Sequence, residues 1–420
     1  MKTTEEKTNF RNQFLKLGQG HIISTDESND VFWSLFWLMP TCANDVYELI
    51  TVADIKKVRQ QNLMNIIQLT RKLCHKVIFI AKESKKFGNN KKETIELLNC
   101  VRFLIKVLPF IFELAIYPTE LEREIFWNND FDPMQFLQRL EASRNEDEPE
   151  DNNNWERVLS PDQATNSIAV NLMSSLVDLL FIRNFTVASS VSKSSATGKD
   201  NKLLHVWEPG IGSTSKYQQP NVMIDSNRTE ILKLLLTLCS NSLYQQVSSV
   251  TTQGSKFLTL LVTVTPKIEL LTLVSSLLNI ACRSSKLTGS ENGLVFEKQE
   301  YSETRHLCVT YSIQLLTLMV VYPLPQKSEL KFLSEGGLCS KPYNMARAFM
   351  GKIHKENELL FITSSLIDLL KVPLINAKDQ ETDTFSLLRP GSNYKRPSLW
   401  SLEAVMLIWE LLQSNRKFAA

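Results

Sequence analysis

One short segment constrains the fold of this chain more than any other. From residue 231 onward, apolar side chains recur so densely that they cover nearly every side of a helix, at Ile231, Leu232, Leu234, Leu235, Leu236, Leu238 and Cys239. A helix that is apolar on all sides has to be covered by other elements. The chain therefore has to pack further structure around this segment, which predicts a helix in the middle of the fold.

The residues that precede this helix predict an ordered loop and a helix cap. Pro209 fixes one φ angle, and two nearby glycines allow positive φ, so the backbone can turn tightly there. Asn227 and Glu230 are three residues apart, as in a capping box, which predicts Asn227 as the N-cap. We expect structural roles for Trp207, Glu208, Gly210, Gly212, Asn227, Arg228 and Glu230.

Most of the remaining chain repeats the helical period of apolar residues. Further helices are expected at 63–77, 93–117, 163–182, 256–264, 268–283, 304–322, 343–351, 356–371 and 397–415. Only 13 glycines are present, and no segment alternates as a strand would. The sequence predicts an all-α fold, an irregular α-solenoid-like stack of antiparallel helices with long polar loops. No fixed repeat period is found, so no particular repeat class is assigned.

Two polar segments divide this helical pattern. Residues 141–162 are acidic and rich in Asn, and residues 189–202 are rich in Ser, Lys and Gly with little to bury. Both compositions are typical of flexible loops. We expect an N-terminal helical region at 1–140 and a second at 163–420 that carries the insertion 189–202.

The uncharged segment 307–326 is a candidate for either a membrane span or a buried helix. A span needs about 20 mainly apolar residues. This segment contains Thr, Ser and Gln, and Pro323 interrupts it, so a buried core helix is favoured. The seven cysteines are odd in number and widely spaced, which favours reduced core residues over a disulfide framework. The N-terminus has no apolar signal region.

Four aromatic residues, Phe32, Trp33, Phe36 and Trp37, fall on one side of a predicted helix. They could anchor the core or form a partner-binding patch, and the core interpretation is favoured because such stripes usually pack inward.

A basic run begins in the last turns of the helix at 63–77 and continues beyond it. It contains Arg71, Lys72, Lys76, Lys82, Lys85 and Lys86. A solvated face is the favoured interpretation, and contact with an anionic membrane surface, worth up to about 1 kcal/mol per close basic residue, is the alternative. The net charge of the chain is only +2, so no strong field attracts nucleic acid.

The C-terminal helix carries two tryptophans. Trp400 and Trp409 are nine residues apart, about two and a half turns, so they face opposite sides. One side can pack on the helix at 356–371. We expect the other side to stay exposed and to support self-association or the docking of another chain, with Trp400 on the exposed side.

Motifs of catalysis are missing from the sequence. It contains no Gly-x-Ser-x-Gly elbow, no phosphate-binding Gly-x-x-x-x-Gly-Lys, no Cys-x-x-Cys and no His-Glu-x-x-His. His205 and Glu208 could form an acid–base pair, but loop residues that orient the turn are favoured. No cofactor or metal is expected. An enzyme whose site is assembled from distant residues remains an alternative.

The dispersed residues around the organising helix carry a resemblance to a known family. They are Trp207-Glu208, Gly210-Ile211-Gly212, Pro220-Asn221, Asp225, Asn227-Arg228, Glu230 and 232–237, with further agreement at 98–102, 107–113, 353–356 and 366–374. This pattern resembles the high-temperature-induced dauer-formation protein family, which is distantly grouped with the dymeclins. Many members begin Met-Gly and can be myristoylated, whereas Lys2 follows Met1 here. The resemblance covers the N-terminal part of a typical, longer member.

This resemblance implies a function as well as a helical fold. Members are large helical peripheral proteins of the Golgi and secretory pathway. It therefore implies a non-catalytic cytosolic scaffold, peripheral on Golgi or vesicle membranes, that supports vesicle-mediated protein sorting and secretion with proteins of that pathway as partners. The alternative is an α-solenoid adaptor that recruits an enzyme or another partner elsewhere in the cytosol.

Overall fold

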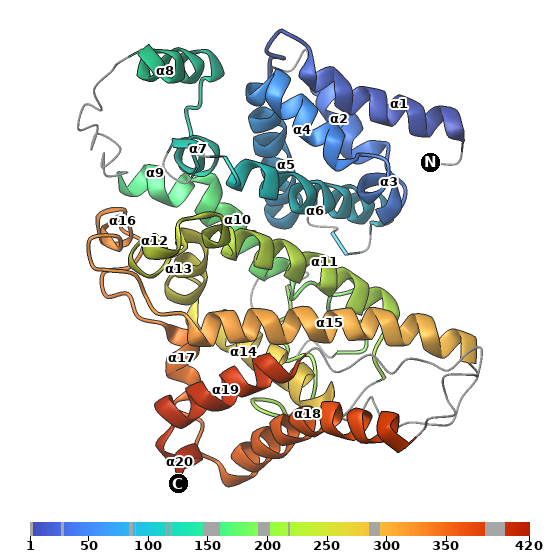
Figure 1. Ribbon diagram of the computed structural model, residues 1–420, viewed down its shortest axis with the longest axis vertical. Coiled ribbons are helices and arrows are strands. Elements are labelled where there is room, and N and C mark those ends of the chain that lie inside the picture. The colour runs from blue at the N-terminus through green and yellow to red at the C-terminus, as the bar shows by residue number, and fades with distance from the viewer. Residues whose placement is uncertain are drawn as a thin grey trace. The chain divides into compact units, whose positions relative to one another are not determined.

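The computed structural model describes residues 3–26, 29–83, 87–88, 90–114, 116–117, 120–145, 160–191, 202–216, 219–284, 295–382 and 400–420. Within these residues the protein is built from helices and turns, with three isolated β-bridges and no β-strand (Figure 1). The prediction of an all-α fold is confirmed. The segments 146–159 and 192–201, which make up most of the two expected polar loops, lie outside the described residues.

The chain forms two compact units that interleave along the sequence. Unit 1 consists of Met1–Leu203, Lys233–Leu260 and Pro325–Pro342. Unit 2 consists of Leu204–Leu232, Leu261–Leu324 and Tyr343–Ala420. This division differs from the linear one expected from composition, because α10 (Ile168–Leu179) packs on α5 (Leu63–Glu83) and so joins the N-terminal helices. Two of the five boundaries fall inside helices, one in α11 (Val222–Cys239) and one in α13 (Lys256–Thr263).

Unit 1 is organised around α5 and α6 (Lys91–Phe112), which pack against each other. Its other helices are α1 (Thr4–Leu15), α2 (Asp30–Leu38), α3 (Ala43–Tyr47), α4 (Val52–Gln61), α7 (Glu120–Glu122), α8 (Pro133–Asn145), α9 (Pro161–Asn166), α12 (Val247–Gln253) and α16 (Lys331–Glu335). Short 3-10 or π turns cover Lys16–Gly18, Arg123–Trp127 and Asn241–Tyr244. Helix α6 continues through Pro109 to Phe112, although a proline inside a helix usually kinks or breaks it.

The aromatic residues of α2 belong to the core of unit 1. Trp33 and Phe36 are fully buried, and Phe32 and Trp37 are half-buried. The ring of Phe36 meets that of Phe103 edge-on at 5.7 Å. The core interpretation of this stripe is therefore confirmed, with the two flanking rings only partly covered.

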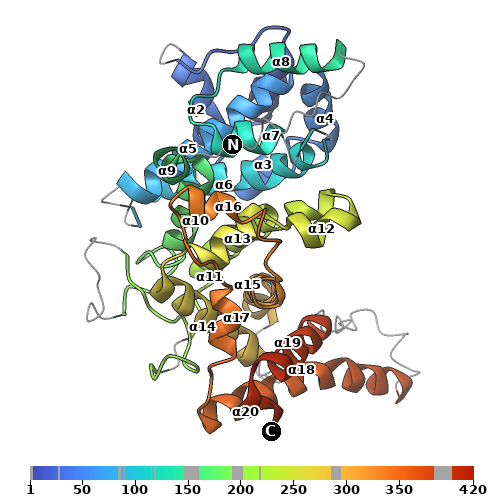
Figure 2. The same cartoon turned by 90° about the vertical axis from the view of Figure 1, so that its left-hand side faces the viewer.

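Unit 2 is organised around α14 (Lys267–Arg283) and α15 (Val295–Val321), which pack against each other. It also contains α17 (Met345–Met350), α18 (Glu356–Thr382), α19 (Ser401–Ser414) and α20 (Arg416–Ala419). Helix α19 packs on both α15 and α18, and these C-terminal helices are grouped together in Figures 1 and 2.

The uncharged segment 307–326 lies mostly in α15 and is a core helix. Its buried residues include Cys308, Val309, Ile313, Leu316 and Met319. Among the described residues, no single helix is long and apolar enough to cross a membrane. One pair, Val247–Thr263 with Lys267–Arg283, passes that test together on length and composition, with a bend of 100° between its helices. All seven cysteines are free thiols, and five are buried.

Candidate functional site

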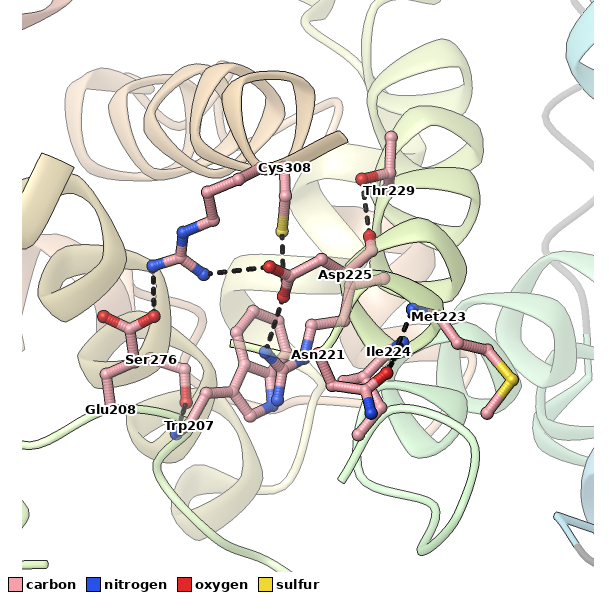
Figure 3. A network of polar contacts seen from close by, with 11 residues as sticks. Trp207, Glu208, Asn221, Met223, Ile224, Asp225, Thr229, Ser276 and Cys308 are labelled. Carbon is pink, nitrogen blue, oxygen red and sulfur yellow. Dashed lines mark hydrogen bonds and ion pairs between the residues drawn. The ribbon is translucent and has the colours of Figure 1, made fainter. Parts of the chain in front are cut away.

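The family-like residues gather in unit 2, where the loop 204–216 lies beside α11, α14 and α15. Helix α11 begins at Val222, earlier than the sequence suggested. Asn221 is its N-terminal cap, because its Oδ1 accepts hydrogen bonds from the backbone N–H groups of Met223 (3.0 Å) and Ile224 (3.2 Å) (Figure 3). The prediction that Asn227 caps the helix is wrong. The three-residue spacing of Asn227 and Glu230 also occurs inside a continuous helix, and Asn227 is buried in the second turn.

Four buried charges form the centre of this site. Arg305 of α15 is paired with Glu208 of the loop and, at 3.2 Å, with Asp225 of α11. Asp225 also receives Arg228 of the same helix at 3.2 Å. All four side chains are at least nine-tenths buried. Two carboxylates balance two guanidinium groups, so the cluster has no formal net charge.

Burial and the charges of the cluster together shift the pKa values of Arg305 and of the neighbouring Cys308. Burial alone would lower the pKa of Arg305, but Glu208 and Asp225 outweigh it and raise that pKa above its ordinary value. Cys308 lies 4.0 Å from Asp225, and burial, reinforced by that carboxylate, raises the pKa of its thiol to about 12. A thiol with this pKa is not a nucleophile at neutral pH.

Trp207 covers one side of the charge cluster. Its ring lies under the guanidinium of Arg228, at 4.4 Å from the ring centre. Its backbone N–H donates to the hydroxyl of Ser276 on α14 at 3.3 Å (Figure 3). The ring is half-buried rather than fully enclosed. Trp207 therefore joins the loop to α11 by a ring contact and to α14 by a backbone hydrogen bond.

Asn279, also on α14, fixes the loop by three hydrogen bonds. Its Oδ1 accepts from the N–H of Ile211 at 2.8 Å, and its Nδ2 donates to the carbonyls of Glu208 (2.9 Å) and Ile211 (3.1 Å). Gly210 has a φ of +147°, and a Cβ there would lie 2.5 Å from Asn279 Oδ1. Gly212 has a φ of +72°. Both glycines are required by this backbone path.

Sequence reasoning missed the partners supplied by α14 and α15, namely Asn279 and Arg305. The available signal for Asn279 was an amide within an apolar stretch of helix, since buried polar groups need partners. Arg305 follows a charged stretch of α15, so no such signal was present for it. Asn279 lies 68 residues from Ile211, and Arg305 lies 97 residues from Glu208. The local sequence pattern therefore could not show that they contact this loop.

The arrangement is suited to holding a fold rather than to catalysis. Glu208 pairs with Arg305, which leaves no acid–base pair with His205. Burial and the charge of Arg228 lower the pKa of His205, so its ring is neutral at pH 7. Burial likewise raises the pKa of Cys74 to about 12, so Cys74 and His75 do not form a nucleophile–base pair. In the part of the chain that the structure describes, no group of three His, Cys, Asp or Glu residues could hold a metal ion.

A surface groove of about 380 Å³ lies elsewhere in unit 2. It is lined by His354, Glu356, Leu359, Leu360, Thr363, Lys417, Phe418 and Ala420. None of the family-like loop residues reaches it, and it is open to solvent.

Arg71, a possible membrane-contact residue in the alternative interpretation of the basic run, is a structural residue of unit 1. Its Nη1 donates to the backbone carbonyls of Glu124 (2.7 Å), Ile125 (3.0 Å) and Asn128 (2.8 Å). A guanidinium that satisfies three carbonyls is unavailable to a lipid headgroup. Neither interpretation of the basic run describes Arg71, because its guanidinium is bound to backbone carbonyls of unit 1.

The neighbouring lysines also have partners within unit 1. The pairs are Lys72 with Asp30 (3.0 Å), Lys76 with Glu96 (2.9 Å) and Lys82 with Asn171. Lys85 and Lys86 lie outside the described residues. The described part of the basic run therefore makes protein contacts, as expected for a folded surface, and does not form a free basic patch.

The two C-terminal tryptophans face different sides of α19, as expected. However, Trp400 is the buried one and Trp409 the exposed one, which is the reverse of the expectation. Trp400 is only 4% exposed; its Nε1 donates to Thr310 at 2.9 Å, and its ring lies 4.8 Å from that of His306. Trp409 is 63% exposed. The expectation of a partner surface on the Trp400 side is wrong, because spacing shows that two residues diverge but not which one meets α15.

Comparison with known proteins places this chain in a family. The chain is 26% identical over its whole length to Protein HID1 of Homo sapiens, covering 49% of that protein. It is 23% identical over 99% of its length to the Ubp5-interacting protein ftp105 of Schizosaccharomyces pombe, covering 48% of it. The chain thus spans about half the length of these relatives. No solved structure matches it. The family model described as Hid1, high-temperature-induced dauer-formation protein, matches residues 1–420, and the chain therefore belongs to the Hid1 family.

Proposed function

We propose that this protein is a non-catalytic scaffold that acts peripherally at Golgi or vesicle membranes and supports protein sorting and secretion. The observation that carries the proposal is that the family-like residues are used inside the fold. Glu208, Asp225, Arg228 and Arg305 neutralise one another, and Asn279 fixes the loop. Residues that catalyse a reaction have to reach a substrate, whereas these residues stabilise a helical framework that offers surface to partner proteins.

Localisation of the full chain tests this proposal. A tagged protein should co-fractionate with Golgi or vesicle membranes and should be released by high salt or alkaline carbonate without detergent. Loss of the protein should delay the secretion of a reporter cargo. A protein that stays in the high-speed supernatant, with normal secretion in its absence, would contradict the proposal.

An anionic membrane surface is proposed as one partner, because a peripheral membrane scaffold has to contact the bilayer surface. The described residues of the basic run, which make contacts within unit 1, are not proposed as that contact. Liposome sedimentation with and without anionic lipid measures the electrostatic part of any binding. Electrostatic binding should weaken as salt rises, because the Debye length shortens from about 10 Å at 0.1 M to 3 Å at 1 M. If the bound fraction changes neither with salt nor with the content of anionic lipid, an anionic membrane surface is excluded as a partner.

A second candidate is an adaptor that holds a partner protein elsewhere in the cytosol. It is favoured by the name of one relative, the Ubp5-interacting protein of Schizosaccharomyces pombe. Affinity purification from separate membrane and cytosolic fractions distinguishes the two candidates. Recovery of one stable partner only from the cytosolic fraction favours the adaptor, whereas recovery of secretory-pathway proteins from the membrane fraction favours the scaffold.

A further inference from the structure

Helix α19 has an apolar outward face in addition to the face that packs on unit 2. Its inward residues, Ala404, Leu407 and Leu411, are fully buried. Its outward apolar residues are Leu402, Val405, Met406, Trp409 and Leu412, which are 68%, 51%, 38%, 63% and 45% exposed. We call these five residues the α19 stripe. They extend along three turns of one helix face.

The spacing within the stripe is that of a helix that pairs with another helix. Leu402 and Trp409 are seven residues apart, and so are Val405 and Leu412. Two interleaved sets with a period of seven form the seam along which helices pack side by side. Isolated exposed apolar residues are common on protein surfaces, but a continuous seam of five large side chains on one helix marks an interaction surface.

We propose that the α19 stripe is the contact surface between two copies of this chain, packed as an antiparallel pair of α19 helices. The stripe itself carries no charge, so two copies can approach without like-charge repulsion. The one acidic residue in the second half of α19, Glu410, turns inward and is paired with Arg347, with Nη2 of the arginine 2.9 Å from Oε2. A self-complementary face of this kind suits a two-fold symmetric interface.

The charges at the ends of α19 select the antiparallel orientation. Arg416 and Lys417 are exposed directly beyond its C-terminal end. A parallel pair would bring two copies of this basic end together. An antiparallel pair keeps the two basic ends apart, and it also opposes the two helix dipoles.

The side chains of the stripe fit a definite antiparallel register. If Leu402 of one copy meets Leu412 of the other, then Val405 meets Trp409, so that a small side chain faces a large one. The seam from Leu402 to Leu412 is about 15 Å long at 1.5 Å per residue. From their exposed fractions, the five side chains present an apolar area on the order of 500 Å² per copy, so a pair buries roughly 1,000 Å², near the lower limit of specific interfaces. A reversible, concentration-dependent dimer is therefore expected.

Sedimentation velocity of the full 420-residue chain over a dilution series tests the proposal. The weight-average mass should rise from monomer toward dimer with increasing concentration. Trp409→Glu places a charge in the centre of the seam and should raise the dimer dissociation constant roughly 30-fold or more, as for a central interface residue. Ile268→Glu is the matched control, because Ile268 is a 71% exposed apolar residue on another helix of unit 2. That control should leave the dissociation constant unchanged.

Three outcomes of this experiment overturn the proposal. One is a wild-type chain that stays monomeric up to about 100 μM, a concentration at which even a weak specific dimer is populated. The second is a dimer that Trp409→Glu does not weaken. The third is an equal loss with Ile268→Glu, which would indicate a general effect of added charge. Matching thermal melts of the variants establish that each one is folded.

Disulfide crosslinking tests the orientation separately. The background is Cys42→Ser with Cys339→Ser, because these two cysteines are the ones that are not buried. A mixture of one chain with Leu402→Cys and another with Leu412→Cys should crosslink under mild oxidation much faster than either chain alone. Fast crosslinking of Leu402→Cys with itself, without the mixed product, would indicate parallel helices and would overturn the antiparallel pairing.

Discussion

Neutralising Asp225 is the most direct test of the buried charge cluster. The Asp225→Asn side chain keeps its shape but loses its charge, and the cluster is left with two guanidinium groups and one carboxylate. Arg228 and Arg305 each place Nη1 at 3.2 Å from a carboxylate oxygen of Asp225. At an effective dielectric constant of about 20, each such pair is worth on the order of 5 kcal/mol before desolvation is subtracted. Removing one partner of a buried pair costs about 3–5 kcal/mol net.

Hydrogen exchange followed by mass spectrometry measures this loss in the elements that make the contacts. A loss of 3–5 kcal/mol speeds exchange by about 150- to 5,000-fold wherever protection depends on the cluster. We expect the largest increase in peptides from α11, α14 and α15. Denaturant unfolding followed by circular dichroism gives the corresponding loss in the free energy of unfolding.

A charge-balanced double variant is the control. Asp225→Asn combined with Arg228→Met leaves Glu208 and Arg305 as a neutral pair, and the methionine keeps an apolar contact with the Trp207 ring. The double variant should be more stable than Asp225→Asn alone. If Asp225→Asn lowers the free energy of unfolding by less than about 1 kcal/mol, the scale of an exposed ion pair, the view that the four charges are buried and stabilise one another is refuted. A double variant no better than the single one would refute the charge-balance argument.

The remaining predictions concern other contacts of the fold. Asn279→Ala removes three hydrogen bonds to the loop and should lower the free energy of unfolding by about 2–3 kcal/mol in denaturant titrations. Burial would raise the pKa of Asp45, but hydrogen bonds, chiefly from Thr41, lower it from 3.8 to about 2. The ionised form therefore stabilises the protein above pH 4, and this contribution is lost as the pH falls toward 2. Asp45→Asn should cost about 1–2 kcal/mol at pH 7, and its difference from wild type should shrink over that pH range. In denaturant titrations, Trp400→Ala should lower the free energy of unfolding by about 3–5 kcal/mol and Trp409→Ala by less than about 1 kcal/mol. Equal losses for the two variants would contradict the assigned burial.

Helical periodicity in the sequence was enough to predict the all-α class and the main core helices. The apolar period at 304–322 predicted a buried helix, and Cys308, Val309, Ile313, Leu316 and Met319 of α15 are in the core. The stripe from Phe32 to Trp37 predicted a core anchor for the same reason. These inferences succeed because helical periodicity is local: the side chains that share a face lie within a few residues of one another.

Helix ends were less well determined. Asn221 and Asn227 are both suitable cap residues in isolation, and each is followed by helix-forming sequence. In the structure Asn221 Oδ1 accepts hydrogen bonds from the backbone N–H groups of Met223 and Ile224, whereas Asn227 lies in the second turn of α11. Residue type alone therefore does not fix the first residue of a helix.

The ion pairs between distant residues, and the helix faces that are buried, could be read only from the three-dimensional structure. Arg305 completes the cluster from 80 residues beyond Asp225, and Arg71 is engaged by carbonyls more than 50 residues away. Spacing showed that Trp400 and Trp409 diverge, but packing on α15 decided that Trp400 is buried. Periodicity gives the relative directions of side chains on one helix, whereas burial and pairing depend on distant segments that the local pattern does not contain.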